Sequence, residues 1–238
     1  MKQPTLVFDP GRPVESFRDL LRDLVRGYKF DVKGLLLDDG SVEPLPREAA
    51  VVGKVLEVSI KNYLRRRLLQ LNGLVCIPAA SDRTYPDFTF NGSLISPNRF
   101  AVDLKCARRN ARGDKTSYPI TIGTFDAEYF HYPDQKTANI EMPYGSYTTH
   151  FALIALYDYV DTTARNVELL VVEKWRVATR KRSSGTRCYI AAVSDIGALR
   201  SEAGAFSSEE EFNAFWRSQP VKAEKLSRWQ AKQREGHR

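Results

Sequence analysis

The chain has 238 residues, of which 42% are hydrophobic and 27% are charged. These values are typical of a globular protein that forms one domain around its own core. Three scattered cysteines without a Cys-x-x-Cys pair argue against a disulfide framework and a zinc site, and they suit a reducing cytoplasm. The first residues show no signal-peptide pattern, and the most apolar stretch is too short to span a bilayer. We therefore expect a cytoplasmic protein without a membrane partner.

The charge balance is basic. Thirty-six Lys and Arg residues against 29 Asp and Glu residues give a net charge of +7. Such a balance favours polyanionic partners, because each neutralised phosphate releases counterions. Basic residues gather at 65–67, 108–112, 180–187 and in the tail after Trp216. Charge alone does not decide the partner, since many basic proteins bind nothing anionic.

The first third of the chain predicts two helices around a hairpin. Apolar residues at helical spacing predict a helix over 14–28. An Asp-Gly pair typical of tight turns predicts a hairpin over 31–45. A longer helix is predicted over 47–71, where an Asn-Gly pair ends it.

The pattern then changes to the two-residue period of strands. Three strands are predicted over 74–78, 84–90 and 99–107, and the last two are joined by a turn-rich segment. Residues 109–150 have little periodicity and predict loops with short elements. The apolar run over 146–160 fits either a helix or a buried strand.

The last third predicts a strand over 167–179 and a basic loop over 180–187. A Ser cap followed by three glutamates predicts a helix over 207–219. Beyond Pro220 we expect a basic, polar and mobile tail.

Two of the predicted strands bring charged side chains to one face. In Phe100–Lys105 the apolar residues alternate with Asp103 and Lys105, so these two point together away from the core. Asp87 alternates with phenylalanines in the strand before it. If the two segments pair as neighbours, two carboxylates and one ammonium group converge on one patch.

Such a patch suits the hydrolysis of phosphodiesters. Carboxylate oxygens are the ligands that Mg²⁺ prefers, and one or two suffice when phosphate and water complete the shell. A bound Mg²⁺ polarises the phosphate and activates water, and a lysine beside it orients that water. The alternative is an edge strand on which Asp103 and Lys105 form a solvated ion pair.

The same residues carry a family resemblance. Asp87 and Asp103-Leu104-Lys105 match the PD…(D/E)xK signature of restriction-endonuclease-like nucleases. The chain resembles EcoRV-type restriction enzymes in five segments, in the same order: YKFDVKGLLLDDGSVEPL, YPDFTF, FAVDLK, VEKW and FSSEEEFNAFWR. The resemblance covers most of the chain and is weakest over 106–150 and after Trp216. It implies an α/β restriction-endonuclease-like fold, with a mixed central β-sheet flanked by α-helices.

The resemblance also implies an activity. It is that of a type II restriction endonuclease, which cleaves double-stranded DNA at a short palindrome with Mg²⁺ and leaves 5′-phosphates. The implied catalytic residues are Asp87, Asp103, Lys105 and Glu57. The implied metal-binding positions are Asp87, Asp103, Leu104 and Glu57, and Lys105 would assist the attacking water. For Glu57, a solvated position on a helix face is the alternative.

The resemblance implies partners and an organisation as well. The family enzymes are homodimers in which each subunit cuts one strand, and a cognate methyltransferase would protect the host. Residues 1–238 would form a single endonuclease domain. Its dimerisation region would lie at 1–50, its catalytic and DNA-reading core at 78–187, and its basic tail at 217–238.

DNA contacts are implied at several places. A loop entering the major groove would fall at Ser183, Ser184, Gly185, Thr186 and Arg187, and Arg187 could read a guanine. The alternative is a basic loop that touches only phosphates. The remaining implied contacts are a minor-groove loop with Ser81 and Asp82, phosphate contacts from Arg108 or Arg109, and Thr124. Neither the major-groove loop nor the minor-groove loop keeps the glycine- and glutamine-rich sequence of EcoRV, so the recognition sequence is not predicted.

Two other functions fit the same residues. A structure-specific repair or junction nuclease would use the same aspartates and lysine but would cut without sequence preference. A non-catalytic DNA-binding protein on a nuclease fold would need none of them. The intact set of Asp87, Asp103 and Lys105 counts against that second alternative.

Overall fold

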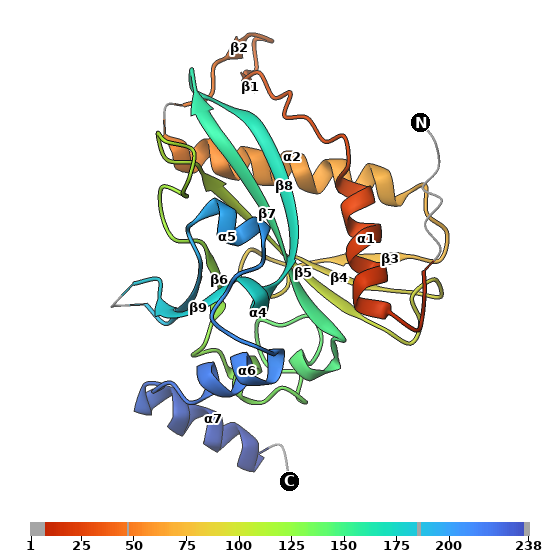
Figure 1. The fold of residues 1–238 in the computed structure, drawn as a ribbon, viewed down its shortest axis with the longest axis vertical. Coiled ribbons are helices and arrows are strands. Elements are labelled where there is room, and N and C mark those ends of the chain that lie inside the picture. Colours follow the sequence, from red (N-terminus) through yellow and green to blue (C-terminus); the bar gives the residue numbers. More distant parts are fainter. Residues whose placement is uncertain (1–7, 47, 185–186, 236–238) are drawn as a thin grey trace.

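The computed structural model describes residues 8–46, 48–184 and 187–235. Helices and strands alternate along the chain, as expected for an α/β protein (Figure 1). In chain order they are α1 (Pro13–Val25), β1 (Leu35–Leu36), β2 (Val42–Glu43), α2 (Ala49–Leu68), β3 (Val75–Pro78), β4 (Phe88–Asn91), β5 (Phe100–Arg108), β6 (Thr121–Thr124), α3 (Glu128–His131), a 3-10 turn η1 (Tyr144–Ser146), β7 (Thr149–Val160), β8 (Thr163–Glu173), α4 (Lys174–Val177), β9 (Ala178–Arg182), β10 (Tyr189–Ala192), α5 (Ile196–Arg200), α6 (Glu209–Arg217) and α7 (Ala223–Glu235).

The central sheet has five strands in the order β3-β4-β5-β7-β8. Strands β5 and β7 run parallel, whereas the other neighbouring pairs are antiparallel, so the sheet is mixed. A second sheet has the order β6-β10-β9, and β1 and β2 form a small hairpin. The predicted fold class, a mixed sheet flanked by helices, is confirmed.

Two hydrophobic cores lie on opposite faces of the central sheet. One contains the buried side chains of α1 and α2 together with Phe88, Phe100 and Val102. The other contains Ala101 of the same strand β5, together with Trp216 of α6. Neighbouring residues of β5 therefore face different cores, as the two-residue period predicts.

The ambiguous segment 146–160 contains the strand β7. Its first nine residues are buried, and it pairs with β5 on one side and β8 on the other. A strand covered on both faces is apolar at almost every position, so its sequence shows no alternation. This explains why periodicity could not separate strand from helix here.

Three expectations about the last third are wrong. The strand expected over 167–179 ends at Glu173, because Lys174–Val177 forms the short helix α4. The loop expected over 180–187 begins later, because Ala178–Arg182 is strand β9. The tail expected to be mobile beyond Pro220 contains the helix α7. Trp229 of that helix is 5% exposed and contacts the rings of His131 and Tyr132. The tail is thus held by a tertiary contact that its polar composition conceals.

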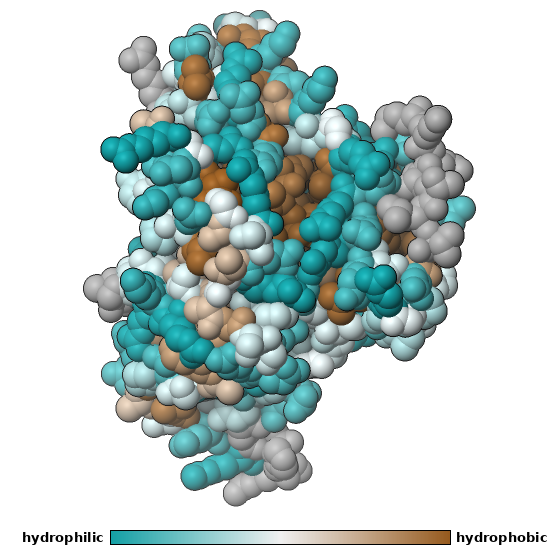
Figure 2. Space-filling model, in the orientation of Figure 1, coloured by the Kyte–Doolittle hydropathy of each residue, from teal (hydrophilic) through white to brown (hydrophobic). Residues whose placement is uncertain are grey.

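The β1–β2 hairpin presents apolar side chains to solvent. Leu36 is 74% exposed and Val42 is 58% exposed. Figure 2 shows hydrophobic surface at the top of the molecule, over this hairpin. In the part of the chain that the structure describes, no helix has the length and apolar character needed to cross a membrane.

Candidate active site

The pairing of β4 with β5 brings Asp87 and Asp103 together. Phe88 lies opposite Val102 in the antiparallel register, so the residue before Phe88 reaches the level of Asp103. The Oδ2 atom of Asp87 accepts a hydrogen bond of 2.8 Å from the backbone N–H of Leu104. Asp103 is 6% exposed. The structure thus brings the two predicted carboxylates to one place.

Three ammonium groups surround this carboxylate pair. Lys105 donates to Oδ1 of Asp103 at 2.9 Å, and Lys174 of α4 lies 3.2 Å from Oδ2 of the same carboxylate. Lys61 of α2 donates to Oδ1 of Asp87 at 2.8 Å. Of these three lysines, only Lys105 was predicted from the sequence. The other two reach the site from α2 and α4, and no local pattern reveals such tertiary contacts.

The two aspartates titrate differently. Burial acts to raise the pKa of Asp103, but the ammonium groups of Lys105 and Lys174 outweigh it and hold that pKa below its usual value. Burial and the neighbouring charge of Asp103 raise the pKa of Asp87, although Lys105 and Lys61 partly oppose the rise. Asp103 is therefore the firmly ionised member, and Asp87 is the one that protonates first.

Glu57 lies on α2, beside the aspartate pair. Its Oε1 atom is 2.6 Å from Lys61 and 3.1 Å from Lys54. Burial would raise the pKa of Glu57, yet these two ammonium groups lower it. Lys61 bridges Glu57 and Asp87, so Glu57 belongs to the charge network of the site but is separated from Asp87 by a lysine.

The donor set fits a divalent cation. Among the described residues no group of three or more His, Cys, Asp or Glu side chains forms a metal cluster. A Mg²⁺ ion, however, needs only one or two protein carboxylates when a substrate phosphate and water complete its shell. Asp87 and Asp103 supply two such carboxylates side by side. Their mutual repulsion contributes to the raised pKa of Asp87, and a cation between them would relieve it.

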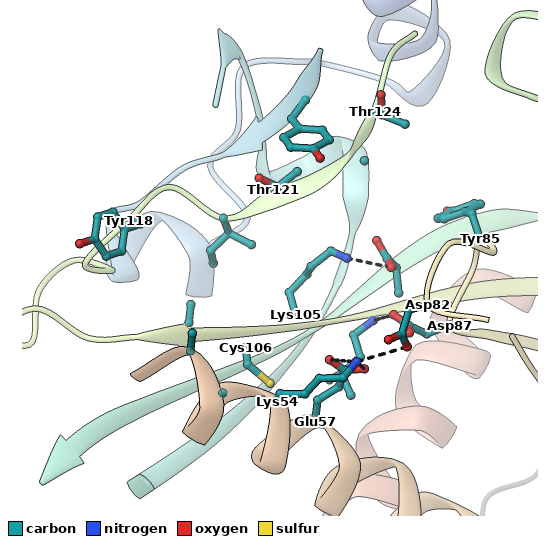
Figure 3. A pocket seen from close by; sticks show the side chains of 18 of the residues that line it. Lys54, Glu57, Asp82, Tyr85, Asp87, Lys105, Cys106, Tyr118, Thr121 and Thr124 are labelled. Atoms are coloured by element: carbon teal, nitrogen blue, oxygen red, sulfur yellow. Dashed lines mark hydrogen bonds and ion pairs between the residues drawn. The ribbon is translucent and has the colours of Figure 1, made fainter. Parts of the chain in front are cut away.

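A cleft of about 1080 Å³ opens at this carboxylate pair. Figure 3 shows Asp87 and Lys105 in the middle of the cleft, with Glu57, Lys54 and Asp82 on one side and Thr121 and Thr124 on the other. Tyr118, which is 80% exposed, also lines the cleft and was missed by the sequence analysis.

The other residues predicted to contact DNA lie at different places. Asp82, Arg108 and Thr124 line the cleft. Ser81 lies next to Asp82, and its hydroxyl is 3.0 Å from that of Thr84. Arg109 is not among the lining residues.

The guanidinium group of Arg109 is already engaged by the neighbouring strands. It is 3.3 Å from Asp158 and 2.9 Å from Glu168, and its side chain is 10% exposed. The structure therefore brings Arg108 to the site and places Arg109 in an ion-pair network outside it.

The predicted base-reading loop begins after β9. Ser184 accepts a hydrogen bond of 3.0 Å from the backbone N–H of Arg187. The backbone N–H of Ser183 donates to the carbonyl of Tyr189, a residue that lines the cleft. Arg187 is exposed, and its guanidinium carbon is 5.9 Å from the centre of the Tyr189 ring. Gly185 and Thr186 lie outside the described residues.

Comparisons with known proteins identify the family of the chain. The family model described as "Restriction endonuclease EcoRV" matches residues 26–235. The type II restriction enzyme EcoRV of Escherichia coli is 23% identical over 226 residues, which cover 84% of this chain and 87% of that enzyme. Among solved structures, the NlaIV restriction endonuclease has a similar fold, with a TM-score of 0.51 and 16% identity over 85% of this chain and 77% of that one. The chain therefore belongs to the EcoRV family of type II restriction endonucleases, which are site-specific deoxyribonucleases.

Proposed function

We propose that this enzyme uses Mg²⁺ to hydrolyse double-stranded DNA at a short palindrome and leaves 5′-phosphates. The convergence of Asp87 and Asp103 beside Lys105 is the observation that carries the proposal. The basic net charge supports a polyanionic substrate. Nucleases of this family are metal-dependent, and the two aspartates are the described groups best placed to hold a cation.

In the proposed mechanism Asp87 and Asp103 hold the cation. The backbone of Leu104, next to Asp103, is proposed as a further metal-binding position. When bound, the cation polarises the scissile phosphate and lowers the pKa of a bound water. Lys105 orients the attacking water and offsets the charge that develops on phosphorus. Attack of that water on phosphorus breaks the bond to the 3′-oxygen, which takes up a proton, so that the phosphate stays on the 5′-oxygen of the downstream fragment.

Glu57 has a conditional role in this proposal. Its carboxylate is held by Lys61 and Lys54. Glu57 can serve as a further metal ligand only when Lys61 moves away from it. Otherwise it keeps Lys61 in place beside Asp87.

The proposed DNA contacts follow from the cleft. Arg108 is the better phosphate contact, because Arg109 would first have to leave Asp158 and Glu168. The loop with Ser183, Ser184, Gly185, Thr186 and Arg187 is proposed to read bases in the major groove. Ser81 and Asp82 are proposed to lie at the minor groove, and Thr124 is proposed to contact DNA across the cleft.

We further propose a homodimer, because a palindrome has two equivalent strands to cut. The exposed apolar residues of the β1–β2 hairpin support the assignment of residues 1–50 to the subunit contact. Residues 78–187 would then form the catalytic and DNA-reading core, and 217–238 a basic tail, within one endonuclease domain. A methyltransferase that modifies the same palindrome is the expected second component of the system.

Digestion of a sequenced phage genome tests the proposal. The genome would be incubated with purified protein and Mg²⁺, or with EDTA, and the fragment ends would be sequenced and tested for ligation without added phosphate. We expect Mg²⁺-dependent fragments that share one palindrome and carry 5′-phosphates. A smear would contradict sequence-specific cleavage and favour a repair or junction nuclease. DNA binding without cleavage would favour a non-catalytic protein.

A further inference from the structure

The proposed mechanism does not use Lys174, which is nevertheless buried against Asp103. Lys174 is 5% exposed, and its ammonium group lies 3.2 Å from Oδ2 of Asp103. A buried ammonium group is costly unless partners surround it. Its position directly after β8, in contact with one of the two carboxylates, points to a role in the site.

The sheet register explains how Lys174 reaches Asp103. Asp103 of β5 pairs with Ala152 of β7, and Ala152 pairs with Val172 of β8. On the middle strand β7, Ala152 therefore places only a methyl group between β5 and β8. Lys174 follows Val172 by two residues and extends across this small residue to the carboxylate.

A chain of buried polar groups holds Lys174 from its other side. Lys174 donates to the hydroxyl of Tyr85 at 3.2 Å, and its ammonium group lies 4.3 Å from the centre of the Tyr85 ring. The Tyr85 hydroxyl is in turn 2.8 Å from Nδ1 of His150. An ammonium group can only donate, so the hydroxyl hydrogen of Tyr85 is available for His150.

His150 fixes the direction of this chain. Burial, together with the charge of Lys174, lowers the pKa of His150 well below its usual value, so the ring is neutral. Its second hydrogen bond goes to the backbone of Tyr144, whose ring stacks on it at 3.9 Å. Nδ1 is then the acceptor for Tyr85, and the oxygen of Tyr85 turns its lone pairs toward Lys174.

Asp103 is consequently held by two lysines, one at the cleft and one buried. The side chain of Lys105 holds Oδ1 and is 28% exposed at the cleft, whereas the side chain of Lys174 holds Oδ2 and is 6% exposed. Tyr85 gives Lys174 a second partner, whereas Lys105 has a hydrogen bond only to Asp103 among the residues that the structure describes. Lys105 can therefore change partner when substrate enters, and Lys174 stays in place.

We propose that Lys174 is a positioning residue of this nuclease: its buried ammonium group, held by Tyr85 and His150, fixes Asp103 in one orientation while Lys105 leaves it for the attacking water. This inference rests on the proposed function of Asp87, Asp103 and Lys105. It predicts that loss of Lys174 affects metal binding and turnover in opposite directions.

The opposite directions have separate causes. Lys174 and a divalent cation compete for the negative charge of Asp103, so removal of the ammonium group strengthens cation binding. The same removal frees the Asp103 carboxylate to rotate, and a misplaced ligand lowers the rate of the chemical step. A residue needed only for folding would lower stability without strengthening cation binding.

The test compares Lys174→Met with the wild-type protein and with Lys115→Met, an exposed lysine outside the cleft. Mn²⁺ binding without DNA is measured by electron paramagnetic resonance, and kcat and KM are measured at saturating Mg²⁺. We expect Lys174→Met to bind Mn²⁺ about threefold more tightly or better. Its kcat should fall roughly 10- to 100-fold, and Lys115→Met should match the wild type. Unchanged kcat, or weaker Mn²⁺ binding, would overturn the inference.

Two further variants complete the test. If Lys174→Met does not fold, Tyr85→Phe decides: it keeps the ring and removes the hydroxyl, so kcat should fall roughly threefold, and an unchanged kcat overturns the inference. Asp103→Asn separates the two proposals. If it still binds Mn²⁺ and cleaves DNA, the proposed function itself is wrong. If it loses both while Lys174→Met behaves as the wild type, only the role of Lys174 is wrong.

Discussion

Lys61 donates a hydrogen bond of 2.8 Å to Asp87, and this contact joins the helix α2 to the first carboxylate of the site. The same ammonium group lies 2.6 Å from Glu57. Lys61 therefore sets the charge balance between the helix and the sheet, and it offers a way to test the ionisation of Asp87.

Replacement of Lys61 by Met should move the pH dependence of cleavage. Burial and the charge of Asp103 raise the pKa of Asp87, and Lys61 partly opposes that rise. Without Lys61 the pKa of Asp87 rises further. Activity that needs ionised Asp87 is lost as the pH falls through this pKa, so the acidic limb of the profile of kcat/KM against pH should shift to higher pH. Lys115→Met is the control and should leave the limb in place; an unmoved limb in Lys61→Met would contradict this role.

Glu209 should make the folded state less stable as the pH rises. Burial raises the pKa of Glu209 from its ordinary 4.5 to about 7, although Thr149 donates to it. The folded state thus binds a proton that the unfolded state has released between these values. Stability is retained below about pH 4.5 and decreases up to about pH 7, by about 3 kcal/mol in all.

The matched variants Glu209→Gln and Glu210→Gln test this pH dependence. Glu209→Gln removes the partly buried charge, whereas Glu210 is a fully exposed neighbour on the same helix turn. In urea denaturation at pH 8, Glu209→Gln should be the more stable of the two, and the difference should vanish near pH 4.5. Equal stability at both pH values would show that Glu209 carries no buried charge.

The proposed subunit contact predicts that Leu36→Glu weakens dimerisation. Leu36 lies on β1 and is 74% exposed. In a dimer that uses the hairpin, a carboxylate at this position would be buried without a partner, which is costly. Leu69→Glu is the control, because Leu69 is 84% exposed at the end of α2 and lies outside the hairpin. In sedimentation velocity, the Leu36→Glu dimer should dissociate at a higher protein concentration than the wild-type dimer, whereas Leu69→Glu should match the wild type. Equal dissociation of both variants would place the contact elsewhere.

Arg108 and Arg109 are neighbours for which the structure predicts different effects. Arg108→Ala should weaken DNA binding on all sequences and reduce the slope of log K against log salt by about one phosphate contact. Arg109→Ala should instead lower stability, because it leaves Asp158 and Glu168 without their shared partner. Binding titrations over a range of salt concentrations, together with thermal denaturation, measure both effects. If Arg109→Ala reduces the salt slope and Arg108→Ala does not, Arg109 leaves its ion pairs to bind DNA.

Much of the central site could be predicted from the sequence. Alternation along β5 placed Asp103 and Lys105 on one face, and the motif with Asp87 supplied the partner strand. Lys61 and Lys174 were not predicted, because their contacts depend on how α2 and α4 are packed against the sheet. A local pattern carries no information about which face of a distant element will meet it.

The fold shows the same limit at its C-terminal end. The Ser cap and acidic first turn of α6 are local signals, and they predicted that helix correctly. Helix α7 has no Ser directly before it and only one acidic residue in its first turn, and it is held by buried Trp229 and by ion pairs from Lys225 to Asp126 and from Lys232 to Glu128. A short helix gains most of its stability from such tertiary contacts rather than from its own residues.

Cleavage of a phage genome by Asp103→Asn, beside the wild-type protein, tests the central claim most directly. Asparagine keeps the size of the side chain and removes the charge that Lys105 and Lys174 surround. With circular dichroism unchanged, we predict discrete Mg²⁺-dependent fragments from the wild type and no cleavage by the variant. Fragments of the same pattern and rate from Asp103→Asn would contradict the assignment of Asp103 as a metal ligand, and with it the proposed active site.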